Sequence, residues 1–232
     1  MYFLTGFAKV IKMKKIKIYH LKYLLGVNFF YTLYVNFFLF GIKGVLKLPI
    51  IIKYGSRVQF YEAGAIEFKQ LLTFNMLTVN SGNKIYIQKG GKLICTGRRS
   101  CFNIKNSVLI YKNGIMELGN NFFANGYTEF NCKKGIRFGN DVLISVHVIF
   151  LDTDYHPIYN LLKQQINPDK EIYIGNNVWI SCNVTILKGC RIADHVVLGA
   201  GSVIANHHLS SSNSIYSGNP IKLIKSGIVW ER

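Results

Sequence analysis

The residues best suited to chemistry lie together in the segment from Asp152 to Pro157, which reads DTDYHP. His156 carries the side chain best able to accept a proton near neutral pH, and Asp152 and Asp154 place two carboxylates just before it. A carboxylate can hold an imidazole in one tautomer, so this pattern predicts a general base with Asp152 or Asp154 as its orienting partner. The alternative is a loop histidine whose ring is bonded to a backbone carbonyl.

The other histidines suggest a second kind of chemistry, a zinc site. Three imidazoles that converge from neighbouring elements could bind a catalytic zinc ion. The candidates are His147, His195, His207 and His208. The spacing of His147 and His156 does not fit the repeat described below, and no third ligand is evident. We therefore rank zinc below acid-base chemistry and expect no metal.

A strict six-residue repeat indicates the elements that must position these residues. Its aliphatic positions are Ile174, Ile180, Ile186, Ile192, Leu198 and Ile204. A helix repeats every 3.6 residues and a strand every 2, so a period of six fits strands and excludes a helix. Short strands separated by tight corners, with each coil covering the open edge of the coil below, form a parallel β-helix with three faces. A β-sandwich explains regular turns but does not require this period.

The repeat is also present upstream, at Phe138, Ile144 and Phe150, and it is interrupted once. It stops after Phe150 and resumes at Ile174, which predicts a protruding loop over residues 152–171. A loop of this length inside a compact domain is uncommon unless it is functional. Its position at the interruption favours a functional role for the histidine that it carries.

The strand-like runs before the repeat are interrupted by glycines and are interpreted as irregular early coils. The predicted organisation is therefore all-β, with one solenoid domain at residues 61–216. An N-terminal extension occupies residues 1–60, and a short tail occupies residues 217–232.

The N-terminal extension combines positive charge with apolar residues. Six lysines between positions 9 and 22 precede an uncharged stretch from Tyr23 to Ile42, which Asn28, Thr32 and Asn36 interrupt. Polar side chains are costly in hydrocarbon, so a full membrane span is the weaker interpretation. We expect the extension to pack on the solenoid or to contact the inner face of the membrane.

Composition limits the partners and the compartment. The formal net charge is +17, yet the basic residues are dispersed and no nucleic-acid-binding motif is present, so a nucleic-acid partner is not expected. A basic surface suits a phosphate-rich cofactor, an acidic glycan or an anionic membrane equally well. The five cysteines are odd in number and include no CxxC pair, which indicates free thiols in a reducing compartment and a cytoplasmic location.

Six blocks of the sequence, in family order, resemble the hexapeptide-repeat acyltransferases. They are GNNFFANG from Gly119, FGNDVLIS from Phe138, DTDYHPI from Asp152, IGNNVWISCNVTILKG from Ile174, LGAGSVI from Leu198 and SGNPIKLIK from Ser217. Within that family they are most similar to the maltose and galactoside O-acetyltransferases and to their polysaccharide O-acetyltransferase relatives. The resemblance implies a left-handed parallel β-helix, a homotrimer, and acetyl-coenzyme A bound between neighbouring subunits.

The resemblance also implies roles for individual residues. It assigns the general base to His156 and a role in holding the acceptor or the developing oxyanion to Asn125, with Asp154 as a candidate orienting carboxylate. The matching donor-side positions are Trp179, Cys182, Gly199, Ala200, Gly201, Ser202, Lys222 and Lys225. The small residues would let the backbone approach the pantetheine arm, and the two lysines would meet the phosphates of coenzyme A. A serine is usual in the family where Cys182 stands, and Trp179 fits an interface aromatic equally well.

The expected function is an acetyl-coenzyme A-dependent O-acetyltransferase that acts on a saccharide hydroxyl, within a surface polysaccharide or its precursor. Two alternatives remain open. One is an N-acyltransferase that acts on an amino sugar or another amine, and the other is a non-catalytic solenoid that binds a glycan or a protein.

Overall fold

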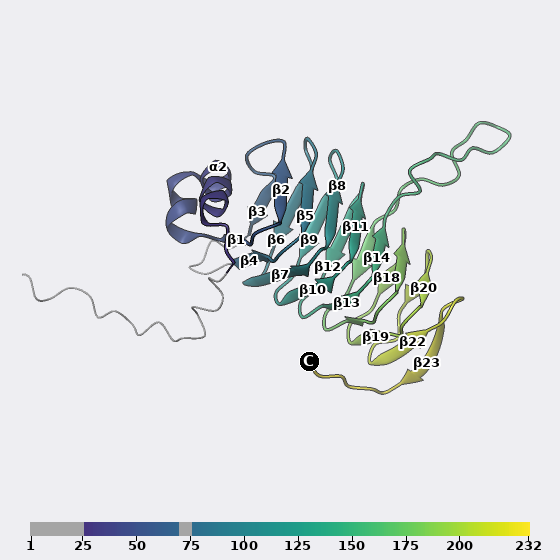
Figure 1. Cartoon of the computed structure of the whole chain (residues 1–232). Helices are drawn as coiled ribbons and strands as arrows, with labels where there is room; N and C mark the ends of the chain where they lie inside the picture. The colour runs from purple at the N-terminus through teal and green to yellow at the C-terminus, as the bar shows by residue number, and fades with distance from the viewer. Residues whose placement is uncertain (1–25, 70–75) are drawn as a thin grey trace, which may run out of the picture.

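The structure is a computed structural model that describes residues 26–69 and 76–232. In these residues, short strands stack into three sheets that run the length of a solenoid (Figure 1). The first sheet contains β1 (Ile50–Ile52), β4 (Met76–Val79), β7 (Arg99–Ile104), β10 (Phe122–Gly126), β13 (Leu143–Val146), β16 (Trp179–Ile180), β19 (Val196–Leu198), β22 (Ser214–Ser217) and β23 (Lys222–Ser226). The second contains β2 (Arg57–Phe60), β5 (Lys84–Ile87), β8 (Ser107–Ile110), β11 (Glu129–Cys132), β14 (Ile149–Leu151), β17 (Thr185–Leu187) and β20 (Val203–Ile204). The third contains β3 (Ile66–Phe68), β6 (Lys92–Cys95), β9 (Ile115–Leu118), β12 (Gly135–Phe138), β15 (Ile172–Ile174), β18 (Arg191–Ile192) and β21 (His208–Leu209).

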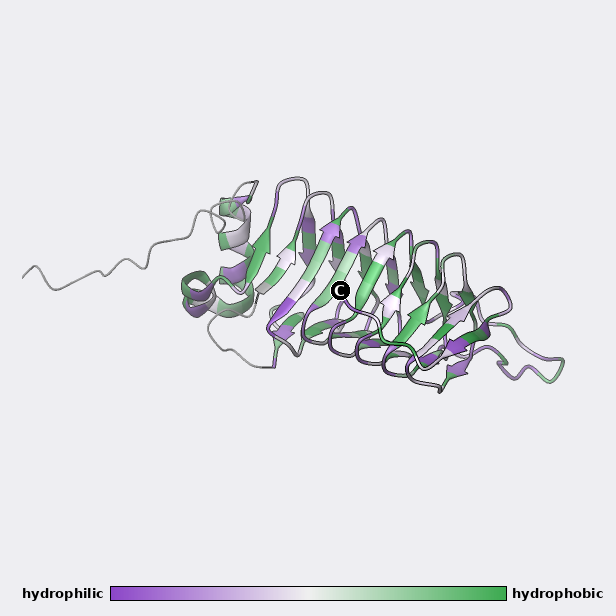
Figure 2. Cartoon of the chain, turned by 90° about the horizontal axis from the view of Figure 1, so that it is seen from below, coloured by the Kyte–Doolittle hydropathy of each residue, from purple (hydrophilic) through white to green (hydrophobic). Residues whose placement is uncertain are grey.

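The six-residue repeat forms the core of the later coils. Ile180 pairs with Leu198 in the next coil, and Ile186 pairs in the same way with Ile204. All six aliphatic positions of the repeat are buried. Apolar residues follow the strands, whereas polar residues are common in the turns between them (Figure 2). The predicted left-handed parallel β-helix is confirmed.

The earlier coils are wider, which explains why their repeat is less regular. Equivalent residues in successive coils are 22 positions apart at Asn103 and Asn125, but 18 apart at Asn176 and Asp194. Only the second spacing is three times six. Larger side chains fill the wider coils, namely Phe102, Phe122, Phe130, Phe138 and Phe150, whose neighbouring rings lie 4.9–6.3 Å apart.

The solenoid begins earlier than predicted. Strands β1 and β2 pair in parallel with β4 and β5, so the first coil starts at Ile50, inside the segment 1–60 that was expected to be an extension. The spacing between these wider coils is not a multiple of six, so a six-residue repeat does not reveal them. At the other end, β23 pairs antiparallel with β22 and covers the last edge of the first sheet, so part of the predicted tail is integral to the fold.

Helix α2 (Phe29–Lys47) closes the opposite end of the first sheet (Figure 1). Its polar residues Thr32 and Asn36 are buried. Thr32 Oγ1 donates to the carbonyl of Ile52 and accepts from its N–H, both at 3.2 Å. Asn36 Nδ2 donates to the carbonyl of Ile50 at 2.8 Å, and Asn36 Oδ1 accepts from the N–H of Ile50 at 3.1 Å. These side chains therefore replace the hydrogen bonds that a preceding coil would give to β1.

The same helix also covers the ends of the other two sheets. The Tyr31 hydroxyl donates to the carbonyl of Val58 at 2.7 Å and accepts from its N–H at 3.0 Å, which satisfies the outer edge of β2. The ring of Phe40 packs 5.7 Å from the ring of Phe68 on β3. Because α2 covers all three edges, it is part of the folded domain.

We predict that Asn36→Leu destabilises the protein although the substitution is apolar. The change removes both partners of Ile50 and leaves a buried N–H and a buried carbonyl without hydrogen bonds, each costing about 1–3 kcal/mol. Urea unfolding should show a free energy of unfolding lower by about 2–4 kcal/mol. Phe37→Leu, on the exposed side of α2, is the control, and equal stability of the two variants would contradict the capping role.

Candidate functional site

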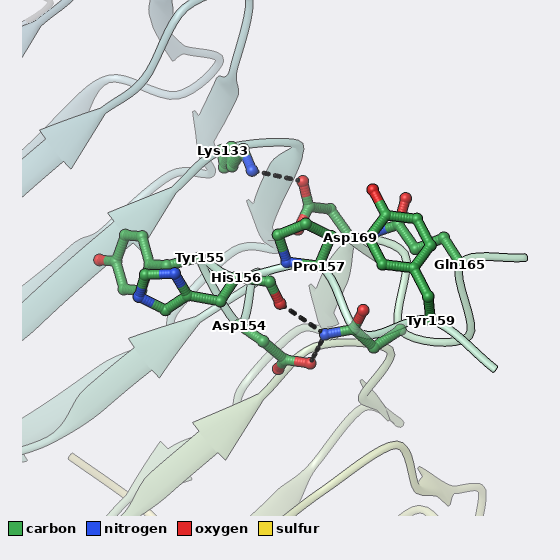
Figure 3. A pocket seen from close by; sticks show the side chains of 9 residues that line it. Lys133, Asp154, Tyr155, His156, Pro157, Tyr159, Gln165 and Asp169 are labelled. Atoms are coloured by element: carbon green, nitrogen blue, oxygen red, sulfur yellow. Dashed lines mark hydrogen bonds and ion pairs between the residues drawn. The ribbon is translucent and has the colours of Figure 1, made fainter. Parts of the chain in front are cut away.

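The predicted loop is present and projects well beyond the solenoid between β14 and β15 (Figure 1). Its arms are held by an antiparallel bridge between Tyr159 and Gln165 and by a hydrogen bond from Ile166 N to Ile158 O at 2.8 Å. A pocket of about 280 Å³ opens at the base of the loop (Figure 3). It is lined by Lys133, Asp154, Tyr155, His156, Pro157, Tyr159, Gln165, Asn167 and Asp169.

His156 lies in this pocket with its backbone fixed and its side chain exposed. Its N–H donates to the carbonyl of Asp154 at 2.7 Å, and its own carbonyl accepts from Asn167 Nδ2 at 2.9 Å. Within residues 26–69 and 76–232, the imidazole has no hydrogen-bond partner. The ring is therefore available to a ligand in the pocket.

Asp154 anchors the loop and does not contact the imidazole. Its carboxylate accepts hydrogen bonds from Lys188 Nζ and from Asn167 Nδ2. Lys188 Nζ also donates to the carbonyl of Asn167 at 2.9 Å, so it joins both arms of the loop to the turn after β17. The hydrogen bonds from Lys188 and Asn167 lower the pKa of Asp154. The orienting role predicted for Asp154 is thus replaced by an anchoring role.

Asp152 has a structural role as well. It is buried, and its carboxylate accepts three backbone N–H groups at 2.7–2.8 Å, from Lys133, Lys134 and Gly135. Burial raises the pKa of this carboxyl, and the three N–H groups partly offset the shift. Asp152 therefore fixes the start of the loop to the turn before β12, and it is not bonded to His156.

Asn125 lies on the outer surface of the first sheet, at the end of a row of asparagines. Asn80 Nδ2 donates to Asn103 Oδ1, and Asn103 Nδ2 donates to Asn125 Oδ1, each at 3.0 Å. This row occupies the oxygen of Asn125 and leaves its NH₂ group as the donor that faces outward. The sequence pattern predicted a role for Asn125. It did not identify Asn103, whose hydrogen bond orients the side-chain amide of Asn125. Asn125 is not among the residues that line the His156 pocket.

Trp179 is exposed on the first sheet and is covered in part by the C-terminal tail. The ring of Trp230 lies 6.0 Å from the ring of Trp179, and Trp230 Nε1 donates to the carbonyl of Asn177 at 2.9 Å. Further along the tail, the guanidinium of Arg232 lies over the ring of Phe123, 4.9 Å from its centroid. Neither tail contact was predicted, because no spacing in the sequence connects these residues.

The small donor-side residues have more than one role. A Cβ on Gly199 would lie 2.4 Å from Ser217 Oγ, so the packing of the next coil requires glycine there. Gly201 has a φ of +71° and open space around it, so its backbone conformation is the constraint. Ser202 is buried, and its hydroxyl donates to the carbonyl of Gly199 at 2.6 Å. Ala200 and Gly201 are exposed and Cys182 is half-buried, so the backbone at Ala200 and Gly201 is accessible to a ligand.

The two predicted phosphate-binding lysines, Lys222 and Lys225, are exposed on β23. The histidines of the zinc alternative are separated. The ring of His147 stacks on Tyr127, and His195 bonds to Asn177. No group of three possible metal ligands is found in the part of the chain that the structure describes.

We predict that Lys188→Met loosens the loop without unfolding the solenoid. The change removes the cation that joins Asp154 to the carbonyl of Asn167, so amide exchange over residues 158–167 should accelerate by roughly five- to tenfold. Lys163→Met, near the tip of the loop, is the control.

The effect of Lys188→Met should depend on pH. Lys188 lowers the pKa of Asp154 in the folded state, so the stabilisation is fully present above the ordinary carboxyl pKa. It is lost as the pH falls through the lowered value. The difference in exchange between parent and variant should therefore disappear in acid, and a difference that persists there would contradict the ion pair as its cause.

Comparison with known proteins agrees with the repeat and the loop. Residues 171–206 match the model of the bacterial transferase hexapeptide family. A polysialic acid O-acetyltransferase from Neisseria meningitidis is 30% identical over 173 residues, which cover 68% of this chain and 79% of the relative. A polysialic acid O-acetyltransferase from Escherichia coli is 32% identical over 108 residues, which cover 46% of this chain and 34% of the relative.

A solved structure supports the same relationship. The crystal structure of the polySia-specific acetyltransferase NeuO superimposes with a TM-score of 0.54 and 26% identity, covering 77% of this chain and 89% of NeuO. This chain spans only about a third of the length of the Escherichia coli relative, but it matches most of the Neisseria relative. The chain therefore belongs to the family of hexapeptide-repeat transferases that includes these polysaccharide O-acetyltransferases.

Proposed function

We propose that the protein transfers an acetyl group from acetyl-coenzyme A to a hydroxyl of a saccharide, as part of the modification of a surface polysaccharide or its precursor. The observation that carries the proposal is an exposed imidazole without a partner among the described residues, in a pocket at the single interruption of the repeat. The family relationship supports the chemistry, because the relatives are named as saccharide O-acetyltransferases.

In the proposed reaction His156 is the general base. A hydroxyl is a poor nucleophile until its proton is removed, so the neutral imidazole takes that proton as the acceptor oxygen forms a bond to the thioester carbonyl carbon. The outward NH₂ group of Asn125 is suited to donate to the carbonyl oxygen as negative charge develops there. The carbon–sulfur bond then breaks, and the imidazolium returns its proton to the departing sulfur. Transfer is direct, and no enzyme residue is acylated.

The donor would lie along the surface that carries Trp179 and the segment 199–202. The exposed backbone at Ala200 and Gly201 allows a thin thioester chain to approach closely. Lys222 and Lys225 on β23 supply positive charge for phosphate groups without a fixed geometry. The same donor surface would serve an N-acyltransferase, so assays with neutral saccharides and with amino sugars separate the two functions.

We also propose that the active unit is a homotrimer. Asn125 lies on the first sheet, whereas the His156 pocket is built on a loop that leaves the second sheet, and Asn125 does not line that pocket. The loop carries exposed apolar side chains at its tip, including Leu161 and Leu162, which suits contact with a neighbouring subunit.

We predict that light scattering will give the mass of three chains, and a fully active monomer would overturn the shared site.

We predict that His156→Ala lowers turnover by roughly 100- to 10,000-fold, the usual contribution of a general base. The Michaelis constant for acetyl-coenzyme A should change little, because the imidazole acts on the acceptor. Release of free coenzyme A measures both effects.

The matched control is His147→Asn, because His147 has a φ of +57°, a backbone conformation that asparagine tolerates. This variant should retain near-parent turnover. The assignment of the base fails if His156→Ala remains active while His147→Asn or metal chelation abolishes turnover. No coenzyme A release with any saccharide or amine would favour a non-catalytic solenoid.

A further inference from the structure

Helix α2 exposes its apolar side chains on the side that faces away from the solenoid. Phe30 is 83% exposed and Leu46 is 80% exposed. The outer face of α2 consists of these two residues together with Tyr34, Phe37 and Ile42. Phe30, Tyr34 and Phe37 follow the helical spacing i, i+4, i+7, opposite the buried Thr32, Val35, Asn36 and Leu39. The helix thus buries two polar side chains beside two aliphatic ones, and it exposes aromatic side chains on the opposite side.

An exposed apolar face of this kind marks a binding surface, and the charge near it in the sequence indicates what it binds. Residues 1–61 contain ten lysines and arginines and no acidic residue, the first being Glu62. Lys43 and Arg57 are exposed on α2 and at the start of β2. Aromatic side chains beside positive charge fit the interface of an anionic lipid bilayer, where the rings enter the headgroup region and the cations meet the phosphates.

The geometry favours a helix that lies on the bilayer over one that crosses it. By length and composition alone, α2 is sufficient for a membrane span. However, Gly41 interrupts the helix with φ and ψ of 63° and −153°, and the first segment, Phe29–Phe40, is only about 18 Å long, against about 30 Å of hydrocarbon. A span would also break the bonds of Thr32 and Asn36 to β1 and place both side chains in lipid.

We propose that the outer face of α2 docks the protein on an anionic membrane surface, with the solenoid standing on the bilayer by its N-terminal end. The aromatic and aliphatic side chains enter the interface, and the exposed Lys43 and Arg57 contact the lipid phosphates. This places the enzyme where a lipid-linked or membrane-proximal acceptor would be found. The proposal stands independently of the acetyl transfer.

The test uses purified full-length protein and sedimentation with phosphatidylcholine vesicles, prepared with and without phosphatidylglycerol. The parent should bind the vesicles that contain phosphatidylglycerol and should be released by high salt, because screening weakens its contact with the lipid phosphates. The variant Phe30→Gln/Phe37→Gln/Leu46→Gln should bind roughly tenfold less or weaker still. All three residues are exposed, so the melting temperature should stay near that of the parent.

The matched control is Tyr86→Gln/Tyr173→Gln, which removes exposed apolar side chains from the second and third sheets. It should bind vesicles as the parent does, with the same mass in solution. The proposal is overturned if the parent does not bind anionic vesicles, or if the triple variant binds as well as the parent. It is also overturned if the triple substitution changes the mass of the protein in solution but not its binding to vesicles, because the outer face would then be a contact between copies. Release of the parent by detergent alone would overturn it too, because that result would indicate a membrane span.

Discussion

The open edge of a parallel strand is the constraint on which this structure depends. Every coil of the solenoid satisfies the backbone groups of the coil beneath it, so the stack has two unsatisfied ends and needs a different solution at each. At one end, Thr32, Asn36 and Tyr31 supply donors and acceptors to β1 and β2 from the side of a helix. At the other end, β23 turns back and pairs antiparallel with β22. The end covered by α2 therefore exposes an apolar surface, and the end covered by β23 exposes a basic one.

The same constraint explains how a long loop is tolerated in the middle of the stack. After the loop, β15 resumes pairing with β12, with Ile172 beside Ile136, so the insertion costs no ladder hydrogen bonds. Asp152 ties the departing chain to the turn of residues 133–135, and Lys188 ties the loop base to the turn after β17. His156 is therefore presented by a loop whose base is fixed on both sides.

The sequence was sufficient for features that repeat and insufficient for features that do not. The period of six predicted the later coils, because an 18-residue coil contains three identical six-residue faces. It missed the first coil, because Ile50 and Arg57 there pair with Leu77 and Lys84, 27 positions later, which is not a multiple of six. His156 could be identified from its position at the interruption, whereas the roles of Asp154 and Lys188 could not. An ion pair between residues 34 positions apart depends on how the loop returns to the solenoid.

The C-terminal tail makes contacts that are of longer range in the sequence than those between neighbouring coils. Contacts between neighbouring coils join residues about one turn of the solenoid apart, so the coils can form successively along the chain. The bond from Trp230 to Asn177 closes 53 residues, and the bond from Arg232 to Asn121 closes 111. Contacts of such long range close the largest loops, so we expect them to form late, once the surface that receives them exists. The pairing of Trp230 with Trp179 therefore makes indole fluorescence a natural reporter of the last step of folding, separate from the assembly of the coils themselves.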